Sequence, residues 1–60
     1  MDKYIIEDWW NHNGTFDREM ASGLHYEGDV ADYLEKTDEW WGSLTDEEKA
    51  DVYEEFFSEV

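Results

Sequence analysis

The most regular hydrophobic pattern of the chain lies in its last third. Positions at helical spacing form a row that comprises Lys49, Val52, Tyr53, Phe56, Phe57 and Val60. Thr45 and Glu48 precede this row at the spacing of a capping box, in which each side chain bonds to the other residue's backbone N–H. The pattern predicts an amphipathic helix over about 46–59 that packs through this row.

A second helix is predicted over about 30–41. Asp29 suits its N-cap, with Asp32 at the third helical position, and Gly42 suits its end. Inside it, the positions that recur at helical spacing are Val30, Tyr33, Leu34, Thr37 and Trp41. A break near Thr37 is the alternative, because Thr-Asp can open a new turn. The connection over 42–44 is short, which favours antiparallel packing of the two neighbouring helices.

The start of the chain has a weaker pattern. Residues 3–10 contain two apolar pairs at i, i+4 spacing, namely Ile5 with Trp9 and Ile6 with Trp10. This spacing predicts a helix that is capped by Asp2 and ends at the Asn-Gly turn of residues 13–14. A short strand over residues 4–6 is the alternative.

A shorter helix is predicted over 16–22, with Thr15 as its cap and Gly23 at its end. Residues 24–28 are expected to form a loop or a short extended segment. Sixty residues allow one domain, so we expect a single acidic helical domain over 1–60. The expected fold class is all-α, a compact single-domain bundle of three to four short helices, with a short extended N-terminal segment as the open alternative.

Aromatic side chains must supply most of the core. The chain has no Cys and two His, so disulfides and thiolate metal sites are excluded and a structural zinc site is not expected. Four Trp, four Tyr and three Phe distinguish it from disordered acidic chains, which are poor in aromatics. No apolar run approaches the roughly 20 residues of a membrane span. The first residues lack a secretory signal, so we expect a cytoplasmic location.

Charge changes the functional picture more than any motif. Eighteen Asp or Glu face four Lys or Arg, a formal net charge of −14. Domains of this size usually carry a net charge of magnitude about 2–8. Such an excess repels nucleic acid and anionic membranes and attracts basic proteins. Direct binding to nucleic acid or to a membrane is therefore not expected, and the leading hypothesis is a decoy that occupies a cationic groove built to hold DNA or RNA.

The acids fall into rows on two of the predicted helices. One i, i+4 column consists of Glu47, Asp51, Glu55 and Glu59, with Glu54 beside it, and a second row consists of Asp32, Glu35 and Glu39. Solvated helix faces usually carry acid–base pairs at this spacing, whereas neighbours in the column are like-charged. We therefore expect these eight acids to bind the partner, with Trp40 as an interface anchor. A merely solvated acidic face is the alternative.

Two pairs of adjacent Trp form an internal echo. The segments Glu7-Asp8-Trp9-Trp10 and Asp38-Glu39-Trp40-Trp41 share an acid-acid-Trp-Trp pattern and start 31 residues apart. Because neighbours on a helix point about 100° apart, one Trp of each pair is expected inside the core and the other at its edge. A duplicated helix-turn-helix would produce this echo, and chance in a Trp-rich chain is the alternative.

No constellation of residues predicts catalysis. The side chains with suitable reactive groups are His12, His25, Ser22, Ser43 and Ser58, and no spacing links them into a triad. Di-metal helical bundles use Glu-x-x-His pairs, and neither His has a Glu three positions before it. Short helices also rarely enclose a substrate cleft. We expect no enzyme activity, no cofactor and no metal.

In size, charge and aromatic content the chain resembles the small phage-encoded inhibitors that mimic DNA, among them anti-CRISPR proteins, anti-restriction proteins and uracil-DNA glycosylase inhibitors. The segment Trp40-Trp41-Gly42-Ser43-Leu44-Thr45-Asp46-Glu47-Glu48-Lys49 through Tyr53 also resembles short phage reading frames. These inhibitors share no common fold or motif, so the resemblance carries over no site residue.

The resemblance implies a phage-type inhibitor in an infected bacterial host. Its expected target is a nucleic-acid-binding defence protein, first a CRISPR effector complex and second a restriction enzyme. The competing hypothesis is an acidic interaction module that binds a basic partner unrelated to nucleic acid. We expect a monomer or a small homo-oligomer in either case.

Overall fold

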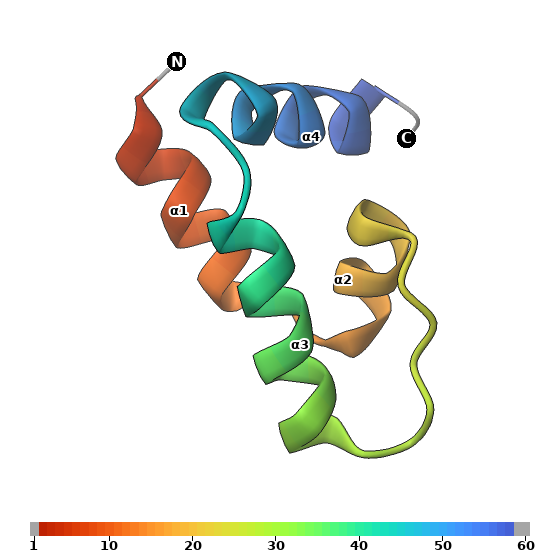
Figure 1. Ribbon diagram of the computed structural model, residues 1–60. Coiled ribbons are helices and arrows are strands. Elements are labelled where there is room, and N and C mark those ends of the chain that lie inside the picture. Colours follow the sequence, from red (N-terminus) through yellow and green to blue (C-terminus); the bar gives the residue numbers. More distant parts are fainter. Residues whose placement is uncertain (1, 59–60) are drawn as a thin grey trace.

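The chain forms four helices within residues 2–58, the part that the computed structural model describes. They are α1 (Lys3–His12), α2 (Thr15–Ser22), α3 (Val30–Gly42) and α4 (Asp46–Ser58), shown in Figure 1. The predicted all-α class is confirmed. The alternative of a strand over residues 4–6 is wrong, because these residues lie in the first turns of α1.

Side-chain caps determine where three of the helices begin, as the sequence predicts. Asp2 and Asp29 each accept a hydrogen bond from a backbone N–H in the next turn, at 2.9 Å before α1 and 3.1 Å before α3. The capping box before α4 is complete, because the Thr45 hydroxyl accepts from the Glu48 N–H at 3.1 Å. In return, the Glu48 carboxylate accepts from the Thr45 N–H at 2.9 Å.

The start of α2 differs from the prediction and its end agrees with it. The helix begins at Thr15 itself, and Gly14 is an N-cap without a side-chain hydrogen bond, so Thr15 is not the cap. At the other end, Gly23 has a φ of 76°, the left-handed conformation that favours glycine after a helix. A loop follows as expected and extends to the start of α3.

Helix α3 is continuous, so the predicted helix over about 30–41 is confirmed and the alternative of a break near Thr37 is wrong. Thr37 is fully buried, and its hydroxyl donates to the Tyr33 carbonyl at 2.8 Å. The side chain therefore satisfies its hydrogen bond within its own helix and does not open a new turn.

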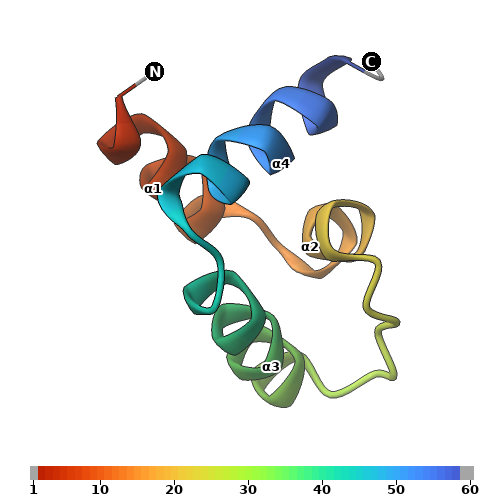
Figure 2. The same cartoon turned by 45° about the horizontal axis from the view of Figure 1, so that its top comes forward.

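Helix α4 packs against α1 and α2, and α2 also packs against α3. Figures 1 and 2 show α4 turning away from α3 after the short connection, with α2 between the start of α3 and the end of α4. The predicted antiparallel pairing of α3 with α4 is therefore wrong. Aromatic packing explains the difference. Trp9 on α1 contacts the α4 rings of Tyr53 and Phe56, each at a centroid distance of 5.2 Å, and these contacts hold α4 against α1.

The core is built from one Trp of each pair. Trp10 is 1 % exposed and Trp41 is 4 % exposed, and together with Ile6 they form the buried cluster. Trp9 and Trp40 are half-buried against it, which confirms the expected division of each pair. Helix α4 covers this core without entering it, since none of its described residues is fully buried. Its apolar row therefore packs over the outside of the core and does not form its centre.

None of the described helices combines the length and the apolar character that crossing a bilayer requires.

Candidate functional site

The acidic column on α4 is exposed as predicted. Glu47, Asp51 and Glu55 follow one another at one-turn intervals, and Glu54 lies beside them. None of these four side chains forms a salt bridge within residues 2–58. Glu59, the predicted last member of the column, lies outside the described residues. The described column is a row of like charges without compensating bases.

The acidic row on α3 is exposed as well, at Asp32, Glu35 and Glu39. These three acids also form no salt bridge within the described part of the chain. Because α4 turns away from α3, the two rows do not run side by side (Figure 2). The structure therefore presents two separate acidic faces and does not pair them like the two strands of a duplex.

Trp40, the predicted interface anchor, is half-buried. Its ring contacts that of Trp10 at a centroid distance of 5.8 Å and packs on the buried cluster. Part of this side chain is thus committed to the core, and only the remaining surface is open to a partner.

An ionic network that the sequence analysis missed lies at the edge of the core, with its two bases largely buried and its two acids partly exposed. The Arg18 guanidinium bonds to the Asp38 carboxylate at 2.7 Å, and the Lys49 ammonium bonds to the Glu7 carboxylate at 2.6 Å. Each cation also lies over an indole ring, Arg18 over Trp10 at 4.7 Å and Lys49 over Trp41 at 5.3 Å. Two of the four bases of the chain are therefore used in the interior.

Arg18 is the centre of the larger half of this network. Its side chain is 5 % exposed. Besides Asp38 it donates to the Thr37 hydroxyl at 3.0 Å and to the backbone carbonyls of Asn13 at 2.9 Å and Leu34 at 3.2 Å. One guanidinium thus ties the end of α1, α2 and α3 together, which explains how a charged side chain is tolerated in the core.

The two halves of the network correspond residue by residue. Glu7 and Asp38, Trp10 and Trp41, and Arg18 and Lys49 are three pairs that are each separated by 31 residues. The contacts are reciprocal, because the Trp10 N–H donates to Asp38 and the Trp41 N–H donates to Glu7, both at 3.0 Å. The helices follow the same relation, since α1 packs on α4 as α3 packs on α2. This is the contact pattern of an approximate two-fold axis.

The pKa of Glu7 is lowered from its ordinary value of 4.5. The largest cause is the hydrogen bond from Lys49, and the indole N–H of Trp41 acts in the same direction, whereas burial opposes both. The network therefore holds this carboxylate in its charged form.

The groups considered for catalysis have other contacts. The hydroxyls of Ser22, Ser43 and Ser58 each donate to a backbone carbonyl of the preceding helical turn, at 2.6, 2.6 and 3.0 Å. His12 pairs with the Asp8 backbone carbonyl in its own helix at 2.7 Å. Within the described residues, no group of three or more His, Cys, Asp or Glu side chains is placed to hold a metal ion.

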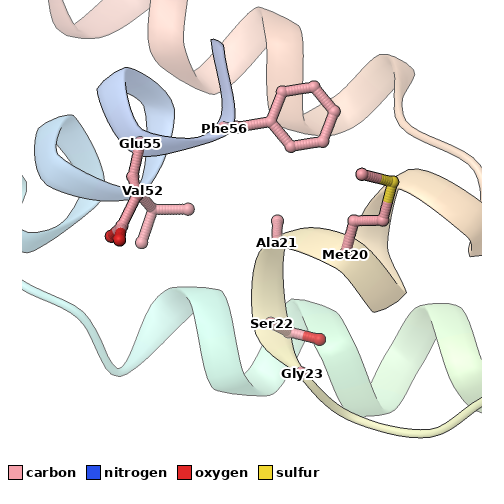
Figure 3. Close-up of a pocket in the computed structure, with 7 residues that line it drawn as sticks. All are labelled: Met20, Ala21, Ser22, Gly23, Val52, Glu55 and Phe56. Carbon is pink, nitrogen blue, oxygen red and sulfur yellow. The ribbon is translucent and has the colours of Figure 1, made fainter. Parts of the chain in front are cut away.

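An open groove lies between α2 and α4, beside the acidic column. It has a volume of about 310 Å³, and its lining includes Met20, Ala21, Val52, Glu55 and Phe56. Figure 3 shows Val52 and Phe56 on the α4 side of the opening and Met20 and Ala21 on the α2 side. Glu55 belongs to both features, so the acidic column forms one edge of the groove, whose lining combines apolar side chains with polar groups such as Ser22.

Comparison of the chain with protein-family models, with curated proteins and with solved structures found no match.

Proposed function

We propose that the protein is an acidic decoy that binds the nucleic-acid-binding groove of a basic partner protein and excludes DNA or RNA from it. The observation that carries the proposal is the state of the surface acids. Seven exposed acids on α3 and α4 form no salt bridge within residues 2–58. Two of the four bases are meanwhile held in the interior by Glu7 and Asp38. The fold thus commits two of its four bases to Glu7 and Asp38, and neither of these two bases pairs with an acid of the rows.

The spacing of the α4 column suits a groove that holds phosphates. Residues four apart on a helix are separated by a rise of about 6 Å. Phosphates advance about 3.4 Å per nucleotide along one strand, so the column offers a charge for roughly every second phosphate. A cationic groove with mobile Lys and Arg side chains tolerates such a difference, because those side chains are long and flexible.

The resemblance to phage-encoded DNA mimics narrows the proposal to a class of target. On that ground the partner is a defence protein in the cytoplasm of an infected bacterium, with a CRISPR effector complex ahead of a restriction enzyme. The protein would then be an anti-CRISPR or anti-restriction inhibitor without enzymatic activity, acting as a monomer or a small homo-oligomer. Two separate acidic faces, on α3 and on α4, also suit a partner whose basic surface is curved around its nucleic acid.

The experiment reverses charge on α4 and follows both binding and competition. Immobilised parent protein is exposed to bacterial lysate, bound proteins are eluted with a salt gradient, and each is tested for release of its bound DNA or RNA. The variant Asp51→Lys/Glu55→Lys should lose capture and competition, because both side chains are exposed and off the apolar row.

The control is Asp8→Lys/Glu27→Lys, which makes the same change in net charge at exposed positions outside both rows. This variant should retain most of the competition. If both double variants compete as well as the parent, the acidic rows are a solvated surface and the decoy proposal is wrong. Capture of a partner without any displacement of nucleic acid would instead indicate a basic partner unrelated to nucleic acid.

A further inference from the structure

We propose that the groove between α2 and α4 receives an apolar side chain of the same basic partner, one that is flanked by Lys or Arg. This inference rests on the proposed function, because the acidic column is what brings a cationic segment to the groove. The groove makes a short-range apolar contact in addition to the long-range charge attraction, so the docking segment combines an apolar side chain with flanking bases.

Large apolar side chains are exposed next to the groove. Met20 lines it and is 59 % exposed, and Phe16, one turn earlier on α2, is 72 % exposed. Residues four apart share a helix face, so the two side chains form one apolar surface along α2. Phe56 faces Met20 across the opening (Figure 3).

The other half of the molecule serves as an internal comparison for these positions. Under the 31-residue correspondence, Phe16 and Met20 match Glu47 and Asp51 of α4, which are exposed acids. The residues of the two ion pairs and the stacked indoles keep their chemical type in both halves, whereas these surface positions do not. The fold therefore does not require an apolar residue at either position. Contiguous exposed apolar side chains without a folding role indicate a binding surface.

Charge complementarity determines what the groove takes. Glu55 lines one edge and Asp51 lies one turn before it, while no Lys or Arg belongs to the lining. A nucleic acid or an acidic peptide would be repelled at this edge. A volume of about 310 Å³ is at the lower limit of small-molecule sites, so the groove fits one or two side chains of a protein segment.

The first part of the test uses two synthetic peptides as probes. Both are Lys-rich helical peptides of identical length and charge, and they differ only in one central residue, Leu or Ser. Calorimetric titration into the parent protein should give about tenfold tighter binding for the Leu peptide, as expected for partial burial of one Leu. Equal affinities for the two peptides would overturn the proposal.

The second part uses variants that separate charge attraction, which changes the affinity of both peptides, from docking, which changes the preference for Leu. Met20→Asp places in α2 the residue that α4 carries at the matching position, and it adds one negative charge. Simple attraction predicts tighter binding of both peptides, whereas docking predicts loss of the preference for Leu. Tyr4→Glu is the matched control, because Tyr4 is 74 % exposed on α1 and lines no part of this groove. It should keep the preference.

The variant Met20→Gln removes the apolar side chain without adding a charge, so it tests docking even if Met20→Asp fails to fold. It should also reduce the preference for Leu to near unity. If Met20→Asp and Tyr4→Glu both tighten binding equally and keep the preference, the groove is not the docking site. The variant Asp51→Lys/Glu55→Lys separates this result from failure of the proposed function. It should weaken both peptides alike; if it weakens neither, the acidic column is not the binding surface, whatever the Leu preference shows.

Discussion

The indole rings of Trp10 and Trp41 are stacked, with an angle of 3° between their planes and 4.5 Å between their centroids. Each N–H donates to an acid on the other ring's helix, Trp10 to Asp38 on α3 and Trp41 to Glu7 on α1. One stacked pair and two reciprocal hydrogen bonds therefore join α1 to α3. Because only side chains make this junction, changes at these four residues should dominate the stability of the fold.

Removing either indole N–H should destabilise the protein to a similar extent. Trp10→Phe and Trp41→Phe keep an aromatic ring and leave one carboxylate without its indole donor. We expect each to lower the free energy of unfolding by about 1–3 kcal/mol, measured by urea denaturation. A large loss in one variant and none in the other would contradict the reciprocal arrangement.

Arg18 and Lys49 should differ in how much stability is lost when each is replaced by the other basic residue. Arg18→Lys removes the planar fork that reaches Asp38, Thr37 and three backbone carbonyls, so we expect a loss of about 2–4 kcal/mol. Lys49→Arg keeps a cation beside Glu7, whose side chain is 38 % exposed and can adjust. We expect its cost to stay below about 1 kcal/mol, the usual value for a partly exposed pair. Thermal and urea denaturation measure both, and equal costs would be unexpected.

The lowered pKa of Glu7 makes part of the stability dependent on acid pH. Its hydrogen bond from Lys49 holds the pKa in the folded state below the ordinary value of 4.5. The ionised carboxylate therefore contributes stability above about pH 4.5, and this contribution is lost as the pH falls through the folded pKa. Glu7→Gln should be less stable than the parent at pH 7, and the difference should shrink below pH 4.5. Urea denaturation across this range would show a constant difference if the coupling were absent.

Added salt should raise the melting temperature of the parent protein. Neighbouring acids in the α4 column repel one another, and screening relieves repulsion between exposed charges over distances of about 10 Å at 0.1 M salt. In Asp51→Lys/Glu55→Lys the column alternates in sign, so the same increase in salt should stabilise it less. Differential scanning calorimetry of both proteins at low and high sodium chloride provides the comparison.

The helices could be predicted from the sequence because their signals are local. The N-caps Asp2 and Asp29, the capping box at Thr45 and the glycine at Gly23 each act within one turn of their helix. The direction of α4 could not be predicted in the same way. It depends on Trp9 meeting rings that lie more than 40 residues later in the chain, and no local spacing encodes that contact.

The exposed acidic rows could be predicted from helical periodicity, whereas the interior charges could not. Arg18 looks like an ordinary surface base in the sequence, and Lys49 falls in the packing row of its helix without any sign of its acidic partner. Both ion pairs become evident only when α2 and α4 pack on α3 and α1. The repeated acid-acid-Trp-Trp pattern was the one available signal. Extending its 31-residue offset by eight positions beyond each second Trp would have paired Arg18 with Lys49.

The loop over residues 24–29 has a consequence for association between chains. It joins the α1–α2 half to the α3–α4 half, and the main helix packings, α1 on α4 and α2 on α3, each cross from one half to the other. A half from a second molecule would offer the same contacts, so an exchanged dimer would have the same interior as the monomer. The length of this loop determines whether the two halves of one chain pack on each other or on the halves of a second chain. Shortening it should favour exchange between chains, and concentrated protein should form a dimer that dissociates slowly after dilution, because its interior must first open.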